Sequence, residues 1–268
     1  MAAVGVVGYE DVRLTDTASV LARAFATDPV FSWLTSHLGS AGRMTALHEI
    51  METLTRAIYA PHGESYLALP EGAKAAQTDI KLKGVLLLHP PLVKESFVDH
   101  MKHGIHRLPV ITGLKGMGKI LPSLLRSSLL KEVVMADSLE RGFWYVGFLA
   151  VDPDCQGQGV GSVLLQSVVD KADKEDLPVY LETGNPRNVP WYEKFGFATV
   201  YTEKAGFMGP TVFYMRREVQ SMDKQTKEQL LAKAKQRVAD SNESLKRGLL
   251  AVGIGFVVLV LLLFYVYR

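Results

Sequence analysis

The residues that could carry chemistry lie between Phe143 and Phe197. Within that range, the glycine-rich run Gln156–Gly161 follows an apolar stretch and precedes a helical pattern. Glycines at such a junction let the backbone approach an anion, because no Cβ interferes, and the free N–H groups of the first helical turn point towards it. The run therefore predicts a pyrophosphate cradle built from main chain, although a glycine-rich turn by itself is a common feature.

Strands and helices on both sides must position this cradle. Trp144–Val151 is almost entirely apolar, as expected of a central strand that is covered on both faces. A helix over 162–170, a strand over 177–183 and a short helical segment with Tyr192 are expected to follow. The predicted order is strand, glycine turn, helix, strand, helix.

The spacing of these residues resembles a known family. Q-x-x-G-x-G after an apolar strand, followed by N-x-x-x-Y-x-x-x-G-F, is similar to the Gcn5-related N-acetyltransferase (GNAT) superfamily. Within it, LETGNPRNVPWYEKFGF resembles the puromycin N-acetyltransferase-like group. The likeness is specific over Trp144–Phe197 and extends loosely to AFATDP near Phe25. It implies an α/β fold, a GNAT-type mixed central sheet flanked by helices, and an enzyme that uses acetyl-CoA as co-substrate.

The resemblance also implies roles for individual residues. The backbone of the last three strand residues would pair with the pantetheine arm, the glycine run with the start of the helix would hold the pyrophosphate, and an asparagine would contact the cofactor near the strand ends. These cofactor-binding residues are Leu149, Ala150, Val151, Gln156, Gly157, Gln158, Gly159, Val160, Gly161, Ser162 and Asn188. Tyr192 would protonate the departing thiolate, which suits a phenol because its pKa lies above that of a thiol. The alternative for Tyr192 is a core aromatic residue.

The reaction needs a base to take the proton of the attacking amine. Glu182 is the candidate, because it ends an apolar strand where a carboxylate is otherwise costly. A structural glutamate bonded to loop N–H groups is an equal alternative, and water or Glu49 could serve instead. Cys155 lies beside the glycine run without a nearby histidine in sequence, so we interpret it as a bystander.

The remaining part of the domain is predicted from hydrophobic periodicity. We expect a short strand from Val12, then a helix capped by Asp16 or Thr17 and interrupted by Asp28 and Pro29. A second helix is expected over 41–59. Antiparallel strand pairs are expected at 65–69 with 83–88 and at 198–201 with 211–216.

Residues 94–140 are expected to be helical, with breaks at Pro109, at Gly113–Gly118 and at Pro122. The run from Gly113 to Lys119 matches G-x-x-x-x-G-K, but Ile120 stands where a P-loop needs a Ser or Thr hydroxyl. We interpret the run as a glycine-rich turn between helices, with a P-loop as a remote second reading.

His100, His103 and His106 form H-x-x-H-x-x-H. Because a helix turns by about 100° per residue, the outer two would lie about 120° apart and could not easily share one metal ion. We therefore expect a polar helix face and no metal site.

The chain ends in a long apolar segment. Leu249–Tyr267 contains 19 uncharged residues, which as a helix would span about 28 Å, enough to cross a bilayer core. Lys246 and Arg247 precede it, and the positive-inside bias then predicts that the preceding domain faces the cytosol. Ala251 and Gly255 weakly indicate self-association through this helix.

These features predict three parts: an acetyltransferase domain at 1–220, a polar helical stalk at 221–248, and a transmembrane tail anchor at 249–267. The endoplasmic reticulum is the favoured membrane, with the mitochondrial outer membrane as the alternative. The stretch from Ser221 to Arg247 has seven basic and four acidic residues, consistent with a spacer or with contact to an anionic surface.

Composition limits the other classes of function. The chain has 30 Lys and Arg against 28 Asp and Glu, so overall charge gives no indication of a nucleic-acid partner. A single cysteine fits a reducing compartment, and the N-terminal residues lack the pattern of a secretory signal. The expected function is acetyl transfer from acetyl-CoA to a small primary amine. The alternatives are a tail-anchored acyl-CoA-binding scaffold without turnover and a protein or peptide N-acetyltransferase.

Overall fold

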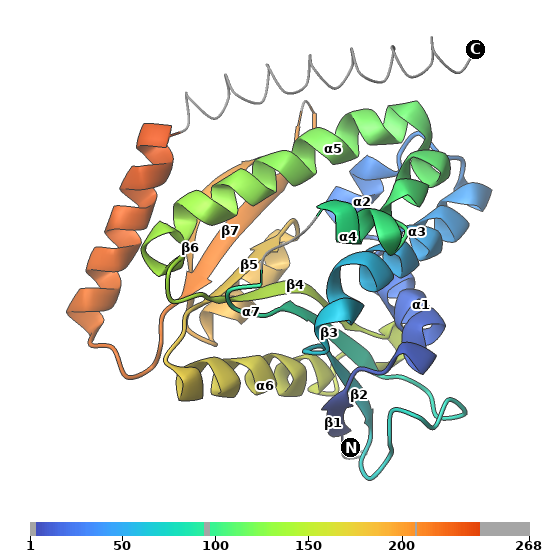
Figure 1. The fold of residues 1–268 in the computed structure, drawn as a ribbon, viewed down its shortest axis with the longest axis horizontal. Helices are drawn as coiled ribbons and strands as arrows, with labels where there is room; N and C mark the ends of the chain where they lie inside the picture. The colour runs from blue at the N-terminus through green and yellow to red at the C-terminus, as the bar shows by residue number, and fades with distance from the viewer. Residues whose placement is uncertain (1–3, 94–96, 207, 242–268) are drawn as a thin grey trace.

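The structure is a computed structural model that describes residues 4–93, 97–206 and 208–241, and its centre is a seven-stranded sheet (Figure 1). The strand order is β1-β2-β3-β4-β5-β7-β6. The strands are β1 (Val4–Gly8), β2 (Tyr66–Pro70), β3 (Gly84–His89), β4 (Trp144–Val151), β5 (Val179–Thr183), β6 (Phe197–Lys204) and β7 (Thr211–Arg217). Neighbouring strands are antiparallel except β4 and β5, which are parallel. The predicted mixed α/β sheet is confirmed.

Helices cover both faces of this sheet. They are α1 (Leu14–Phe25), α2 (Pro29–Leu34), α3 (Ser40–Leu54), α4 (Phe97–Lys102), α5 (Leu108–Val134), α6 (Val160–Glu175), α7 (Val189–Glu193) and a further helix over 224–241. Figure 1 shows α6 on one face of the sheet and α5 on the other, with α1 and α3 on the same side as α5. Strands β4 and β5 are therefore central in a sheet that has a layer of helices on each face.

The face beneath α6 is a closely packed apolar layer. Leu164, Leu165, Val168 and Val169 of α6 are buried with Leu86, Leu88, Val146 and Leu181 of the sheet. Gly84 permits this close approach, because a Cβ there would lie 2.9 Å from both the Ala150 carbonyl oxygen and Leu164 Cδ1. The tight contact fixes the position of α6, and with it the N-terminus that faces the glycine turn.

The early chain differs from the sequence prediction. The strand lies at Val4–Gly8 rather than from Val12, and a 3₁₀ turn at Asp11–Arg13 leads into α1. Asp16 and Thr17 lie inside α1, so neither caps it; Arg13 occupies the cap position without a side-chain cap bond. The buried Arg13 guanidinium instead donates to the carbonyls of Gln77 and Ile80, which ties the helix start to the β2–β3 loop.

Of the predicted breaks in residues 94–140, those at Pro109 and at Gly113 coincide with the start of α5 and with a kink in it, whereas the break at Pro122 is wrong. Only Gly113 leaves helical geometry inside α5, with φ 63° and ψ 179°, so it forms a kink. Gly116 and Pro122 lie within the helix. Gly116 is needed for packing, because a Cβ there would lie 2.9 Å from the His37 ring. A P-loop is excluded at this position because the backbone is helical and not a phosphate-binding loop.

The three histidines do not share one helix face, so the predicted polar helix face is wrong. His100 lies in α4, His103 in the turn after it and His106 in a 3₁₀ turn at Ile105–Arg107. The ring nitrogens of His103 and His106 bond to the backbone carbonyls of Asp99 and Met101.

The helix over 224–241 lies against the domain. Ala234 and Val238 are fully buried among Leu130, Val134 and Tyr214. Arg237 donates to the Val133 and Val134 carbonyls at the C-terminal end of α5, where a cation also offsets the helix dipole. The described part of the predicted stalk is therefore helical and packs on α5.

No helix in the described ranges is long and apolar enough to cross a bilayer. The predicted anchor at 249–267 and the end of the predicted stalk lie outside those ranges.

Candidate functional site

The site is organised by the separation of β4 and β5. Their parallel ladder contains three pairs and ends at Val146 with Leu181, although β4 continues to Val151. On its other edge, β4 remains paired with β3 through Leu149, Ala150 and Val151. The edge of these three residues that faces away from β3 is thus outside the β4–β5 ladder. A ligand with amide groups could pair with that edge, as predicted for the pantetheine arm.

A bulge in β4 contributes to this separation. Leu87 pairs with Phe148 and Leu88 with Val146, so Gly147 is an extra residue in β4. A bulge bends a strand and increases its twist. Glycine is required here because a Cβ would lie 2.1 Å from the Tyr59 hydroxyl. The Tyr59 side chain therefore packs directly on the bend.

The glycine turn lies where β4 ends. Gly157 and Gly159 have φ values of 73° and 81°, in the left-handed region that favours glycine. A Cβ at either position would have no neighbour within 4 Å, so an open space lies beside the backbone. Gly159 precedes the 16-residue helix α6 without any side-chain cap bond. The N–H groups of the first turn of α6 have no acceptor within the helix, which suits binding of a pyrophosphate.

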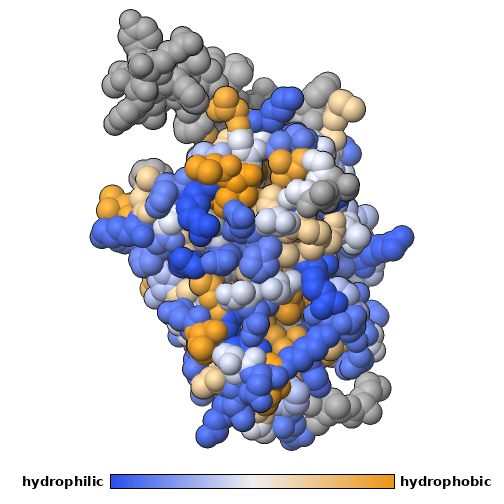
Figure 2. All heavy atoms as spheres, turned by 90° about the vertical axis from the view of Figure 1, so that its right-hand side faces the viewer, coloured by the Kyte–Doolittle hydropathy of each residue, from blue (hydrophilic) through white to orange (hydrophobic). Residues whose placement is uncertain are grey.

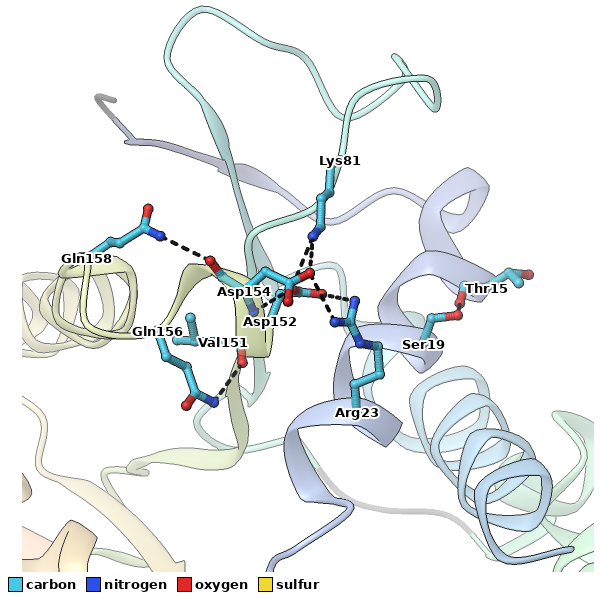
Figure 3. A network of polar contacts seen from close by, with 9 residues as sticks. All are labelled: Thr15, Ser19, Arg23, Lys81, Val151, Asp152, Asp154, Gln156 and Gln158. Carbon is cyan, nitrogen blue, oxygen red and sulfur yellow. Dashed lines mark hydrogen bonds and ion pairs between the residues drawn. The ribbon is translucent and has the colours of Figure 1, made fainter. Parts of the chain in front are cut away.

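A charged network fixes the chain between β4 and this turn (Figure 3). Asp152, which is buried, accepts from the Asp154 N–H and pairs with Arg23 of α1 at 2.8 Å. Asp154 pairs with Arg23 and with Lys81 of the β2–β3 loop. Hydrogen bonds from Lys81 and Arg23 lower the pKa of Asp154 to about 2. Two cations thus offset the negative charges that adjoin the proposed phosphate site.

The two glutamines of the turn bond to nearby backbone. Gln158 Nε2 donates to the Asp154 carbonyl at 3.1 Å, and Gln156 Nε2 donates to the Val151 carbonyl at 3.4 Å (Figure 3). Gly161 lies in the first turn of α6, and a Cβ there would be 3.7 Å from the Trp191 ring. The contact brings the start of α6 next to α7, the helix that carries Tyr192.

Tyr192 is buried at the ends of the central strands. Its ring packs on Trp191 and Phe197, with centroids 5.0 and 5.8 Å away. Burial raises the pKa of the Tyr192 hydroxyl, and the Asp28 carboxylate raises it further. The phenol therefore remains protonated at neutral pH and has a proton to donate. Tyr192 is thus a core aromatic residue, its neighbour Trp191 brings α7 next to the start of α6, and its role as an acid stays a prediction.

Asp28 was not predicted as a site residue. It begins α2, where its side chain accepts from the N–H groups of Val30 and Phe31. Burial raises the pKa of this carboxyl group, and the two backbone bonds oppose the rise. The signal in the sequence was Asp28 followed by Pro29, which is typical of a helix start. Its proximity to Tyr192 depends on tertiary structure and could not be read from that signal.

Glu182 lies on the α5 side of β5. The Tyr180 hydroxyl donates to Glu182 Oε1 at 2.9 Å. Burial raises the pKa of Glu182, and hydrogen bonds from Tyr180 and Ser127, together with the charge of Lys131, oppose this rise. These contacts come from side chains rather than from loop N–H groups. A carboxylate with a raised pKa beside the strand separation is chemically suited to accept a proton.

Asn188 and Cys155 are two further residues that were considered from the sequence. Asn188 is exposed at the start of α7, and its N–H donates to the Asn185 carbonyl. Cys155 is a buried free thiol that packs in the layer beneath α6. Its packing role agrees with its interpretation as a bystander.

This arrangement defines an α/β acyltransferase-type fold, with a glycine turn at the end of a central strand that separates from its parallel neighbour. The model of the acetyltransferase (GNAT) family matches residues 127–197. An uncharacterized N-acetyltransferase of Schizosaccharomyces pombe is 39% identical over 54 residues, covering 20% of this chain and 22% of that protein. The mycothiol acetyltransferase of Propionibacterium freudenreichii is 39% identical over 75 residues, covering 27% of this chain and 23% of that protein. The chain thus matches less than a quarter of the length of each curated relative.

Solved structures agree over a larger part of the chain. An acetyltransferase structure from Corynebacterium glutamicum, described as histone acetyltransferase HPA2 and related acetyltransferase, superimposes with a TM-score of 0.57 at 20% identity. It covers 84% of this chain and 99% of that one. The fold is therefore that of this acetyltransferase structure, and the GNAT family model matches residues 127–197 of the chain.

Proposed function

We propose that the protein transfers the acetyl group of acetyl-CoA directly to a small primary amine. The observation that carries this proposal is the open glycine turn, with the N-terminus of α6, at the end of a strand that has separated from its parallel neighbour. Acetyl-CoA supplies the activated acetyl group as a thioester. Gly157 and Gly159 leave space for its pyrophosphate, and the edge of Leu149–Val151 outside the β4–β5 ladder suits its amides.

Tyr192 and Glu182 are assigned the two proton transfers. Tyr192 donates its hydroxyl proton to the sulfur as the bond between the acetyl carbon and the sulfur breaks, so CoA leaves as the thiol. Glu182 accepts the proton that the amine loses when its nitrogen bonds to the acetyl carbon. Burial raises the pKa of both groups, so Glu182 binds a proton more readily, whereas Tyr192 becomes a weaker acid and its donation depends on close placement beside the sulfur.

Helix α5 lies across the face of the sheet that carries Glu182, and this placement supports a small molecule as the acceptor of the acetyl group. Lys119 of α5 donates to the Trp33 carbonyl and to Ser36 Oγ, and Ser123 donates to the Ala205 carbonyl. These bonds connect α5 with the α2 region on one side and with the β6–β7 turn on the other. A helix fixed across this face restricts access more than an open groove for a polypeptide would. The name of one relative, mycothiol acetyltransferase, also indicates a small molecule.

Membrane attachment is the second part of the proposal. The apolar segment 249–267 is long enough to span a bilayer core, and the basic pair before it favours the cytosolic side for the domain. We propose the endoplasmic reticulum as the membrane. Imaging of a fluorescent fusion to residues 221–268 tests this location, with the mitochondrial outer membrane as the contrary result.

The enzymatic proposal is tested by binding and turnover in the purified full chain. Acetyl-CoA should raise the melting temperature, and CoA should be released faster in the presence of a panel of small primary amines. Binding without amine-dependent release would support the scaffold alternative. Absence of any thermal shift with acetyl-CoA or CoA would refute the acetyltransferase assignment, and faster release with amino-terminal peptides than with small amines would favour a protein acceptor.

A further inference from the structure

An exposed apolar and basic surface lies on α4 and the first part of α5. Its apolar side chains are Val98, Met101, Val110 and Leu114, which are 59%, 39%, 86% and 67% exposed. We call these four residues, with the exposed cations Lys102, Arg107 and Lys115, the α4–α5 surface. Figure 2 shows hydrophobic residues beside hydrophilic ones in the upper part of the side of the molecule that it views. Large apolar side chains that remain this exposed on neighbouring turns are unusual in a protein without a partner there.

The segment from Val98 to Lys119 is predominantly positive. Between Val98 and Lys119 the only acidic residue is Asp99, and it is paired with Lys102. Arg107 and Lys115 are exposed cations in the same segment. Apolar residues interspersed with cations are typical of segments that lie in the interface of an anionic bilayer.

The connection to the apolar segment 249–267 limits how the domain can be oriented. The described part of the helix that begins at residue 224 reaches residue 241, and residues 242–248 connect it to that segment. Seven residues reach at most about 25 Å, even if they are fully extended. A domain of this size has a radius of gyration of about 18 Å, hence a diameter of about 45 Å. The side of the domain near residue 241 must therefore be the side that approaches the bilayer.

The α5 part of the α4–α5 surface lies on that side. The helix over 224–241 packs on the C-terminal end of α5 through Arg237 and Val238, and α5 extends from this contact to Leu108. In Figure 1, the end of this helix and the N-terminal part of α5 both lie toward the top, whereas α6 lies at the bottom. A bilayer reached through residues 242–248 would meet α5 before it could meet α6.

We propose that the α4–α5 surface docks on the bilayer in which residues 249–267 are anchored, with its apolar side chains among the lipid headgroups and its cations against anionic lipids. This proposal rests on the membrane attachment proposed above. It places α5, the helix that covers the acceptor side of the site, at the membrane surface, and so a lipid-soluble amine could reach the site from the bilayer.

The test uses the full chain in nanodiscs of phosphatidylcholine and phosphatidylserine whose headgroups carry a nitroxide quencher. Cys155→Ser removes the natural thiol, and Val110→Cys, Leu114→Cys or Val12→Cys then carries a bimane fluorophore. Val12 is a matched control, because it is 57% exposed and precedes α1, away from α4 and α5. Quenching at 110 and 114 should be several times stronger than at 12, and should fall when Lys102, Arg107 and Lys115 are all replaced by Gln.

Each contrary outcome identifies what has failed. Equal, weak quenching at all three positions in nanodisc-bound protein would refute docking while leaving the anchor intact. Bimane that is already shielded at 110 and 114 in detergent would mean that the chain itself or a second copy covers the surface, which also refutes docking. Protein that does not associate with nanodiscs refutes both the anchor and the docking. Amine-dependent CoA release, measured on the same samples, reports separately on the enzymatic proposal.

Discussion

The Asp28 carboxylate lies within electrostatic range of the Tyr192 hydroxyl, since its charge adds to burial in raising the pKa of that phenol. Asp28 begins the short helix α2, and Tyr192 belongs to the short helix α7. Val30 of α2 contacts Gly184, the residue after β5, so closely that a Cβ at 184 would lie 2.3 Å from Val30 Cγ2. The α2 helix is thereby fixed beside the point where β4 and β5 separate, and it holds Asp28 there.

Replacement of Asp28 separates its charge from its capping role. Asp28→Asn keeps an oxygen that can accept from Val30 and Phe31 but removes the charge next to Tyr192. Because loss of this charge lowers the pKa of the Tyr192 phenol and makes it a stronger acid, we expect kcat to rise with nearly unchanged stability. Asp28→Ala should show the same change in kcat and, in addition, lose about 1 kcal/mol of stability, because the N-cap is lost. Steady-state kinetics and thermal unfolding measure the two effects, and a lower kcat in Asp28→Asn would show that Asp28 does not act on turnover through the pKa of Tyr192.

Tyr192→Phe tests the proposed acid. The substitution removes one oxygen and keeps the ring that packs on Trp191 and Phe197. We expect kcat to fall by about 10²- to 10⁴-fold, the usual contribution of a positioned acid. Acetyl-CoA binding, measured by isothermal titration, should stay the same because the glycine turn is unaffected. Trp191→Phe is the control for ring packing, and an equal loss of kcat in both variants would assign Tyr192 a structural role.

Glu182 should determine the acidic limb of the pH–rate profile. A base works as the carboxylate, and a raised pKa means that this form is lost at a higher pH than for an ordinary glutamate. The rate should therefore fall as the pH decreases through that raised pKa. In Glu182→Gln the rate should be low and this limb should disappear. Glu49→Gln is the comparison, because Glu49 is the other candidate for the base. If the acidic limb persists in Glu182→Gln but disappears in Glu49→Gln, the base is Glu49 and not Glu182.

Local sequence patterns were sufficient for the centre of the fold. The apolar run Trp144–Val151, the glycines of the following turn and the spacing to Tyr192 each depend on neighbouring residues, and the structure has the strand, the turn and the helix in the predicted order. The strand pairs at β2 with β3 and at β6 with β7 were also predicted, because turn residues separate their apolar runs.

Features that depend on tertiary packing were missed. Gly116 looked like a helix break, yet it lies in α5 because the small residue lets the helix approach His37. Ala234 and Val238 form only a short apolar stripe in a polar segment, and their burial depends on a surface that β6, β7 and α5 make together. Asp28 became a site residue for the same reason, since α2 and α7 are distant in sequence and meet only in the fold.

The glycine turn predicts a specific effect on binding. Gly159→Ala places a Cβ in the open space of the turn and imposes a left-handed conformation at φ 81°, which costs about 1 kcal/mol. The Michaelis constant for acetyl-CoA should rise. Gly72→Ala is a matched control, because Gly72 also has φ 81° and open surroundings but lies in the turn after β2. Unfolding should detect a similar loss of stability in both variants, and a similar Michaelis constant in both would exclude the turn from the binding site.

The last prediction concerns the pair that fastens α5 to the sheet. Arg126 of α5 donates to both oxygens of Glu203 on β6, at 2.8 to 3.1 Å, and the two side chains are only 11% and 15% exposed. Because Arg126→Ala would leave a largely buried carboxylate without this partner, we expect a loss of about 3–5 kcal/mol in the free energy of unfolding.

The matched control is Arg141, whose pair with Asp176 has a distance of 2.8 Å but 59% and 60% exposed side chains. Water solvates that pair, so Arg141→Ala should cost less than about 1 kcal/mol. Urea unfolding of both variants measures the difference. A loss in Arg126→Ala as small as that in Arg141→Ala would mean that α5 is held on the sheet by its apolar contacts with Tyr180 and Tyr214 and not by the ion pair.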